Sequence, residues 1–406
     1  MPHTLTPRRE LWLLLTLAGI QFTHILDFMI MMPLGPVLTQ VFGISDAQFG
    51  FLVSAYTLAA GASGLLATTY VDKFGRKRLL LTLYALFALA TLACALAPTY
   101  AALMGARVLA GIFGGVLSSL SQTIVGDVIP FERRGRAMGI VMSSFSLSTV
   151  LGVPLGLWLA TTFNWHAPFF MLAAVCTLLG VAAALTMPVL TGHLQANQGR
   201  SALGMLWAVV REPNHQKALL FSGLLMFAGF TMIPFITIFT TVNVGLPIDQ
   251  VPLIYLCGGV ATLFTARVFG RMTDQRGKVE TFTLLAFAVM APMVALTLLP
   301  RVPLWLLLVV TTAFFIGMSG RMIPGMAIIT SAANPALRGT FMTLNGSVQS
   351  AAMGLASLLG GLIISRDAAG LVQHYWGNAL VGVAASVLAI VMVRRLTLHG
   401  APSGQG

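Results

Sequence analysis

The stretch LWLLLTLAGIQFTHILDFMIMMPLGPVL, residues 11–38, is apolar over almost its whole length and contains one carboxylate, Asp27. A helix needs about 20 apolar residues to cross the hydrocarbon core of a bilayer. Similar stretches recur to the end of the chain, in which 57% of the 406 residues are hydrophobic and 8% are charged. An average soluble domain is about a quarter charged, so the composition predicts an integral membrane protein.

The apolar stretches predict helices, because a membrane-spanning barrel would show alternating strands of about ten residues. Only helices satisfy all their own backbone hydrogen bonds in lipid. We therefore expect an all-α membrane protein with twelve transmembrane helices. The predicted spans are residues 11–38, 47–70, 79–97, 101–127, 137–161, 167–188, 218–242, 250–270, 280–299, 303–328, 340–364 and 372–393.

Lysine and arginine predict the orientation of the chain, since cytoplasmic loops carry an excess of both. With twelve spans the two termini share one side, and 18 of the 23 basic residues fall on that side. Only Arg301 and Arg366 fall on the other side, while Arg107, Arg267 and Arg321 lie within spans. We expect both termini in the cytoplasm, in a bacterial-type inner membrane. The net charge of +12 then faces anionic lipid and does not indicate nucleic-acid binding.

The chain repeats itself at half its length. VDKFGRKR at residues 71–78 is similar to MTDQRGKVE at 272–280, and ERRGRAM at 132–138 is similar to ALRGTFM at 336–342. The offsets are 202 and 204 residues. The matched pairs are Asp72 with Asp274, Gly75 with Gly277, and Arg134 with Arg338.

The repeat predicts two pseudo-symmetric six-helix bundles, at residues 1–190 and 218–406, with a polar cytoplasmic connector at 191–217. Related halves of this kind bind a substrate at their interface near the membrane midplane, and rocking opens the site to either side. The sequence therefore predicts a transporter.

Three motifs carry a family resemblance over nearly the whole chain. The loop at 71–78 has an Asp, a Gly and basic residues, with Thr68 at a position where a glycine is usual. LMGARVLAGIFGG at 103–115 has an Arg followed by glycines, and LGVPLGLWL at 151–159 precedes His166, where an Arg is usual. These motifs resemble the major facilitator superfamily (MFS), specifically its twelve-span drug/proton antiporter branch, which includes bacterial sugar, nucleoside and drug exporters.

The loop motifs predict a cytoplasmic gate. We expect Gly75 to supply the positive φ of a chain reversal and Asp72 to bind the N-terminus of a neighbouring helix. By the resemblance that helix is span eleven, Asp274 acts likewise on span five, and Asp127 is placed to pair with Arg76. Lys73, Lys77 and Arg78 are expected to set topology. The predicted gate residues are Asp72, Gly75, Arg76, Asp127, Arg134, Asp274, Gly277 and Arg338.

The buried charges predict a proton-coupling site. Gln21, His24, Asp27 and Met31 share one helical face, which we expect to line the substrate cavity with Arg107 nearby. An intramembrane charge costs a few kcal/mol, so it persists where it is paired or meets water. A proton can replace Arg107 as the partner of Asp27. The alternative is a static ion pair that fixes helix packing.

Two further residues leave alternatives open. His24 is either a second proton site or a hydrogen-bonded structural histidine. Arg321 either binds an anionic group or extends to the membrane surface. Cys94, Cys176 and Cys257 lie in apolar spans, and their spacing predicts neither a disulfide framework nor a metal site.

The expected energy source follows from a missing motif. The sequence has no G-x-x-x-x-G-K-[ST] loop, so an ion gradient and not ATP is the expected driver. We predict a monomeric secondary active transporter that exports a small amphipathic molecule in exchange for protons, without a cofactor. The alternative is import of a small nutrient by proton symport or facilitated diffusion. A membrane enzyme is disfavoured, because the seven histidines are scattered and no G-x-S-x-G or H-E-x-x-H is present.

Overall fold

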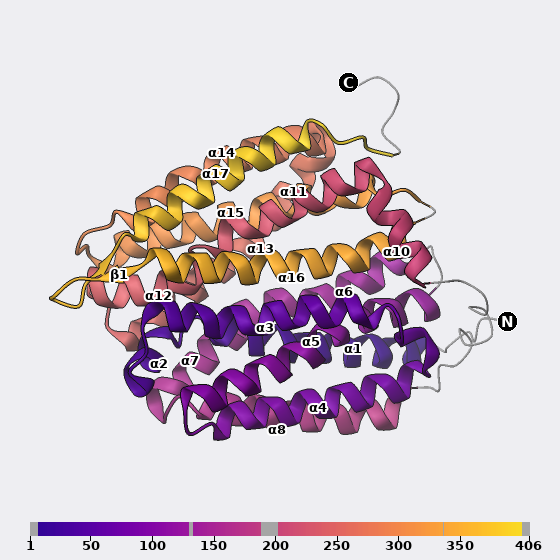
Figure 1. Cartoon of the computed structure of the whole chain (residues 1–406), viewed down its shortest axis with the longest axis horizontal. Helices are drawn as coiled ribbons and strands as arrows, with labels where there is room; N and C mark the ends of the chain where they lie inside the picture. The colour runs from indigo at the N-terminus through magenta and orange to yellow at the C-terminus, as the bar shows by residue number, and fades with distance from the viewer. Residues whose placement is uncertain (1–6, 130–132, 188–201, 336, 400–406) are drawn as a thin grey trace.

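A computed structural model describes residues 7–129, 133–187, 202–335 and 337–399. Within these ranges the chain is almost entirely helical, with a single two-stranded hairpin. Twelve of its helical segments are long and apolar enough to cross a membrane. This confirms the predicted all-α membrane fold. Figure 1 shows the helices side by side, with the first half of the chain in the lower layer and the second half in the upper layer.

The first half begins with α1 (Pro7–Ile30) and α2 (Gly35–Phe42), which divide the predicted first span. Pro33 lies in the turn between them and lacks the N–H that a continuous helix would need. A π-helical turn (Ser148–Gly152) interrupts span five just before Pro154. The other helices are α3 (Asp46–Ala67), α4 (Arg76–Leu96), α5 (Tyr100–Val128), α6 (Arg134–Leu147), α7 (Val153–Thr162) and α8 (Ala167–Thr186).

The second half begins after a short helix in the connector, α10 (Ala202–Arg211), which packs on α11 (Pro213–Phe230) and α16 (Arg338–Ile363). Span seven is broken after α11. It continues through a 3-10 turn (Ile233–Phe235), α12 (Ile236–Phe239) and a π-helical turn (Thr240–Val244). The remaining elements are α13 (Val251–Arg276), α14 (Lys278–Thr297), α15 (Leu304–Ala332), β1 (Ser365–Arg366), β2 (Val372–Gln373) and α17 (Tyr375–Val393).

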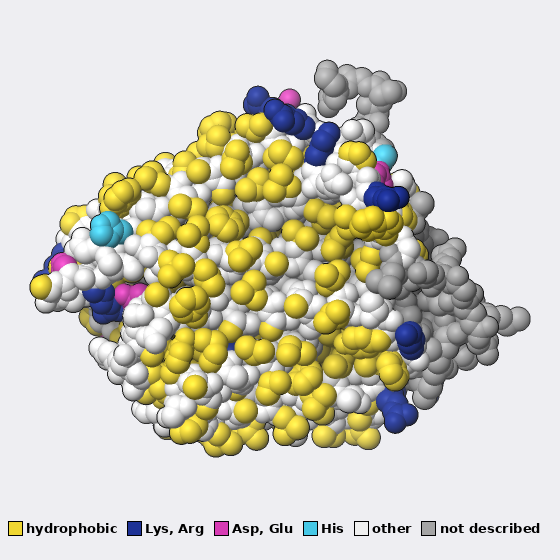
Figure 2. Space-filling model, in the orientation of Figure 1, with side chains coloured by type: hydrophobic (Ala, Val, Ile, Leu, Met, Phe, Trp, Pro, Cys, Tyr) yellow, Lys and Arg dark blue, Asp and Glu magenta, His cyan; other side chains and the backbone are white. Residues whose placement is uncertain are grey.

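The molecule has two ends, which we name by what lies there. The hairpin end carries β1 and β2, at the left of Figure 1. The terminal end is the opposite one, where α1 begins and α17 ends. Figure 2 shows apolar side chains across the face between the ends and charged side chains mostly at the ends. Such a surface is expected of helices in contact with lipid.

Glycines bring α3 and α5 into close contact. A side chain at Gly111 or Gly115 of α5 would collide with the backbone carbonyls of Tyr56 and Ala60 in α3. Small residues at this spacing let membrane helices approach until their backbones touch. This packing fixes α3 against α5 inside the first half.

The opposite side of α3 meets α16 of the second half, and again the contact is between backbones. A Cβ atom at Gly50 would lie 2.9 Å from the carbonyl oxygen of Ser357, and one at Gly61 would lie 2.9 Å from that of Ser347. We call this contact, through Gly50, Gly61, Ser347 and Ser357, the α3–α16 seam. It joins the two halves along the length of both helices.

Candidate functional site

A buried ion pair lies within the first half. Asp27 of α1 and Arg107 of α5 are both fully buried, and Arg107 Nη1 donates to Asp27 Oδ2 across 2.6 Å. Thr91 of α4 donates to Asp27 Oδ1 at 3.3 Å, and the Arg107 guanidinium lies 4.4 Å from the centroid of the Tyr56 ring in α3. Four helices therefore converge on one pair of charges.

This pair is incompletely hydrogen-bonded. Arg107 Nη1 also donates to the backbone carbonyl of Asp27 at 3.1 Å, but Arg107 Nε and Nη2 have no acceptor among the described residues. The contact is therefore single, whereas strong Arg–carboxylate pairs usually form two parallel bonds. Buried ion pairs repay the loss of hydration only when their remaining polar groups are also bonded. The Asp27–Arg107 pair should thus add little net stability.

A chain of ring contacts connects the ion pair to the interface between the halves. Phe230 of α11 stacks on Phe28 of α1 with 5.8 Å between ring centroids, and Phe28 stacks on Tyr56 at 5.6 Å. Tyr56 in turn lies against Arg107. A change at the interface can therefore reach the guanidinium through two side chains.

His24 lies one turn of α1 before Asp27 and is partly exposed. Its ring is 6.1 Å from that of Tyr56 and 6.2 Å from that of Phe87, measured between centroids. Within the described part of the chain, neither ring nitrogen forms a hydrogen bond of standard geometry. The ring does lie against Gly114 of α5 and forms a weaker hydrogen bond with its backbone, so both alternatives for His24 stay open.

The structure corrects the expectation that one polar face of α1 borders an open cavity. Gln21 is buried and donates to Ser118 of α5 at 3.3 Å, Asp27 is buried in its ion pair, and Met31 lies fully buried in the apolar core. The helical period groups these residues on one face, but it does not reveal whether that face meets water or another helix. Here it meets helices of the same half.

Arg321 of α15 is a second buried cation, 1% exposed. Its Nη1 donates to Ser386 of α17 at 2.9 Å, and its Nη2 donates to the carbonyl of Leu225 in α11 at 3.2 Å. The side chain lies inside the second half and does not reach the surface. The expectation that it extends to the membrane surface is therefore wrong.

The predicted gate residues lie at the terminal end. Arg76 is buried and donates to the carbonyl of Val71 at 3.2 Å. The side chains of Asp72, Asp127 and Arg134 lie outside the described residues, so the expected pairing of Asp127 with Arg76 stays a prediction.

The expectation for Gly75 is wrong in this structure. Gly75 has φ −60° and begins α4 in an extended conformation, because a 3-10 turn (Val71–Lys73) makes the reversal. Its counterpart Gly277 does have a positive φ, 92°. Asp274 is exposed, as is Arg338. Because the side chains at residues 134–136, where span five begins, lie outside the described residues, the expected contact of Asp274 with span five stays a prediction.

The hairpin end holds an ion pair that the sequence analysis did not predict. Arg366 of β1 donates from Nε and Nη2 to the two carboxylate oxygens of Asp46 in α3, both at 2.8 Å. These hydrogen bonds raise the pKa of Arg366 above its ordinary value. The available signal was that Arg366 is one of two basic residues on that side. Asp46 instead resembled an ordinary acid at a helix start, after the capping residue Ser45.

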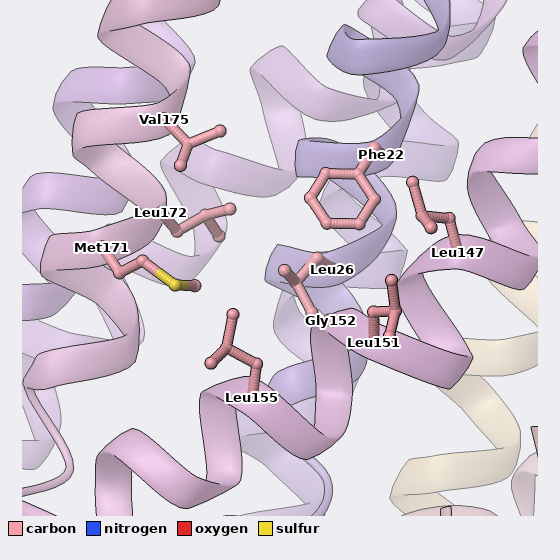
Figure 3. Close-up of a pocket in the computed structure, with 9 residues that line it drawn as sticks. All are labelled: Phe22, Leu26, Leu147, Leu151, Gly152, Leu155, Met171, Leu172 and Val175. Atoms are coloured by element: carbon pink, nitrogen blue, oxygen red, sulfur yellow. The ribbon is translucent and has the colours of Figure 1, made fainter. Parts of the chain in front are cut away.

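A groove on the first half is lined entirely by apolar side chains, shown in Figure 3. It lies between α1, the π-helical turn of span five, α7 and α8, and Leu151 and Leu155 on its rim are exposed. It offers no polar group to a substrate. Within the described residues, no cluster of His, Cys, Asp and Glu side chains could hold a metal ion.

The described part of the chain has twelve membrane-crossing helices in two halves, and each half contains at least one buried charged side chain. This architecture is that of a polytopic membrane transporter. The chain belongs to the Major Facilitator Superfamily, and its match to that family covers residues 17–357.

Relatives and solved structures agree with this assignment. The chain is 24% identical over 399 residues to the MFS-type transporter YceJ of Bacillus subtilis, covering 98% of this chain and 97% of that protein. Its fold is similar to that of a bacterial homolog of the human lysosomal transporter Spinster, in an inward-facing and occupied conformation. That match has TM-score 0.77, 15% identity, and covers 98% and 100% of the two chains.

A D-xylose–proton symporter has the same fold, with TM-score 0.76, 17% identity and 97% and 98% of the two chains covered. The family and these proteins are transporters and not enzymes. The chain is accordingly a transporter of small molecules, and its family generally carries out secondary transport.

Proposed function

We propose that the protein is a proton-driven antiporter that exports a small amphipathic molecule by alternating access. The observation that supports this most directly is the single hydrogen bond between the buried Asp27 and Arg107. A proton entering the site can take the place of that one bond. Arg107 then keeps its other two contacts, with the backbone carbonyl of Asp27 and with the ring of Tyr56.

The coupling runs through the ring contacts. Substrate binds between the halves, beside Phe28 and Phe230, and presses Tyr56 against Arg107, which holds Arg107 on Asp27 and keeps the carboxylate ionised. Once the substrate has left, the bond from Arg107 can open, and a carboxylate left alone in a nonpolar interior is strongly disfavoured, so Asp27 takes up a proton. His24, one turn away, is the second candidate proton carrier, and its ring lies beside that of Tyr56. Substrate and proton therefore exclude one another.

The membrane potential provides the energy. One charge crossing 100 mV releases about 2.3 kcal/mol. In this proposal the terminal end, which carries most of the basic residues, faces the cytoplasm of a bacterial-type inner membrane. The protein works as a monomer surrounded by lipid, with no cofactor.

The two ends then act as gates. In this proposal the Asp46–Arg366 pair is the gate of the hairpin end, which faces away from the cytoplasm. When it is open, the loops of the terminal end close the cytoplasmic side. The residues of this cytoplasmic gate are Asp72, Gly75, Arg76, Asp127, Arg134, Asp274, Gly277 and Arg338.

The test uses everted membrane vesicles whose interior is acidified by respiration, with a fluorescent amine dye that reports the pH difference. An exported compound added outside should release protons and restore the fluorescence in the wild type. Asp27→Asn should abolish this release while downhill exchange of the compound persists. Coupled release by Asp27→Asn at the wild-type rate would overturn the assignment of Asp27.

Import is the alternative, and the same preparation distinguishes it. A proton symporter would acidify the lumen of right-side-out vesicles when its substrate is added outside, and it would release no protons from everted ones. The solved D-xylose–proton symporter has this fold, so fold alone does not choose between the directions. The exporter-like LGVPLGLWL of span five favours export.

A further inference from the structure

Arg321 has no counter-charge. Its two hydrogen bonds go to neutral acceptors, Ser386 and the carbonyl of Leu225, and its Nε has no acceptor among the described residues. The acids of the second half lie near the ends of the helices or in loops, and none pairs with Arg321 in the described structure. They are Asp249, Asp274, Glu280 and Asp367.

The two halves differ in this respect. The first half contains a balanced pair, Asp27 and Arg107. Helices α5 and α15 correspond at an offset of 204 residues, which places Thr311 at the position of Arg107. At the offsets of 202 and 204 the position of Asp27 falls on Gly229 or Thr231, and neither is an acid. Among its described residues the second half instead has one buried arginine, Arg321, on the same helix as Thr311.

An arginine keeps its charge in a protein interior. A buried charge without a partner is strongly destabilising, and inside a membrane such residues usually mark the path of a substrate or an ion. Neutral acceptors satisfy some of the N–H groups of Arg321, but they do not cancel its charge. The missing component is an anion.

Arg321 lies close to the interface where a substrate would bind. A Cβ atom at Gly229 of α11 would be 3.7 Å from Arg321 Nη2. The next residue is Phe230, whose ring stacks on Phe28 of the first half. Span seven is broken directly after Phe230, two residues beyond Gly229.

We infer that Arg321 binds the anionic group of the substrate, and that the substrate is a lipophilic monoanion such as a carboxylate. One cation balances one negative charge, and Met318 beside Gly229, together with the stacked rings of Phe230 and Phe28 that follow along α11, suits an apolar body. The inference rests on the proposed function and specifies its substrate class. Exchange of one such anion outward for one proton inward moves the equivalent of two positive charges into the cell. The membrane potential therefore contributes twice the free energy that it contributes to the movement of one charge.

Melting of the purified protein at fixed pH tests this, with three naphthalene probes that differ in charge. They are 2-naphthoate, neutral 2-naphthamide and cationic 2-naphthylmethylammonium. Millimolar 2-naphthoate should raise the melting temperature of the wild type, and the other two should raise it less. Arg321→Met should lose this preference for the anion, and Arg321→Lys should keep it. Arg267→Met, which removes an exposed arginine of α13, is the matched control and should behave as the wild type.

Stability without any ligand gives an independent readout. Removal of an uncompensated buried charge should make Arg321→Met melt at a higher temperature than the wild type. A lower melting temperature would indicate a purely structural arginine and would count against the inference. Equal stabilisation of the wild type by the three probes, or none by 2-naphthoate, would overturn it.

The result is separable from the proton assignment. Asp27→Asn should still prefer 2-naphthoate, because no proton gradient is present in the melting experiment. If coupling through Asp27 fails in vesicles while the anion preference disappears with Arg321, the anion site stands and the proton site is wrong.

Discussion

Asp46 of the first half and Arg366 of the second half meet through two parallel hydrogen bonds of 2.8 Å at the hairpin end. Among ion pairs whose partners are both described, it is the one that joins the two halves. Nearby, a Cβ atom at Gly35 would lie 2.9 Å from the side chain of Ile238, across the same interface. The pair therefore closes this end of the interface.

Loss of the pair should open the hairpin end. Asp46→Asn removes the negative charge and leaves Arg366 without its ionic partner. If the pair stabilises the closed hairpin end by about 1 kcal/mol, its loss changes the ratio of closed to open molecules about fivefold. We measure labelling of Ile238→Cys by a membrane-impermeant maleimide in a variant without the native cysteines. We expect faster labelling with Asp46→Asn, and slow labelling again when Asp46→Arg is combined with Arg366→Asp. Unchanged labelling would show that the pair does not close the interface.

Alkaline pH should not open this end. The hydrogen bonds to Asp46 raise the pKa of Arg366. The ion pair therefore stabilises the closed state fully at any alkaline pH below the ordinary pKa of arginine. This stabilisation is lost only when the pH rises above the raised pKa of Arg366. Arginine already titrates far above neutral pH. Maleimide reacts faster as pH rises, so we express labelling of Ile238→Cys relative to a cysteine at the exposed Ala369. That ratio should stay constant from about pH 7 to about pH 9.

Tyr56 should matter for coupling through its ring and not through its hydroxyl. The ring lies 4.4 Å from the Arg107 guanidinium, and a buried contact of this type contributes about 2 kcal/mol. Tyr56→Leu should therefore reduce compound-dependent proton release at least tenfold, whereas Tyr56→Phe should release protons nearly as the wild type does. The everted-vesicle assay measures both. Equal loss in the two variants would assign the role to the hydroxyl.

Packing of α5 on α3 should depend on Gly111. Its Cβ would collide with the carbonyl of Tyr56, and overpacking of this kind costs about 1–3 kcal/mol. Gly111→Ala should thus lower the melting temperature of the purified protein. Gly105→Ala in the same helix meets nothing within 4 Å, so it should be neutral or stabilising. If both variants melt as the wild type does, the helices are less closely packed than described.

Gly277 should be needed for its backbone conformation alone. Its φ of 92° and ψ of 152° fall in a region that only glycine adopts readily, and strain there costs about 1–3 kcal/mol. A Cβ at Gly277 would meet nothing within 4 Å, and the same holds for Gly270. Gly277→Ala should lower the melting temperature and Gly270→Ala should not. A neutral Gly277→Ala would mean that the loop adopts another conformation.

Most of the fold could be predicted from the sequence, because membrane helices are marked by length and composition. The positions at which the helices are broken could be predicted from the sequence only in part. Pro33 indicated the division of span one, but span seven breaks at Thr231, three residues before Pro234. That break is held by tertiary contacts: Asn378 of α17 donates to the carbonyl of Thr231 at 2.9 Å, and Tyr375 donates to that of Met232 at 2.9 Å.

The candidate site was predictable in its residues but not in its geometry. A charge in a membrane span is conspicuous, so Asp27, Arg107 and Arg321 were found. The orientation of each side chain depends on residues that are distant in the sequence, such as Thr91 for Asp27 and Ser386 for Arg321. The Asp46–Arg366 pair spans 320 positions of sequence, and no local pattern relates its two members.

The α3–α16 seam bears on how easily the halves can move. Where large side chains interlock, each must leave its socket before two helices can shift, and the van der Waals attraction given up in that step sets a barrier. Gly50 and Gly61 present bare backbone to α16, so at these two positions no side chain has to be withdrawn before the helices shift. The time needed for one transport cycle should then depend on breaking the bonds at the two ends of the molecule.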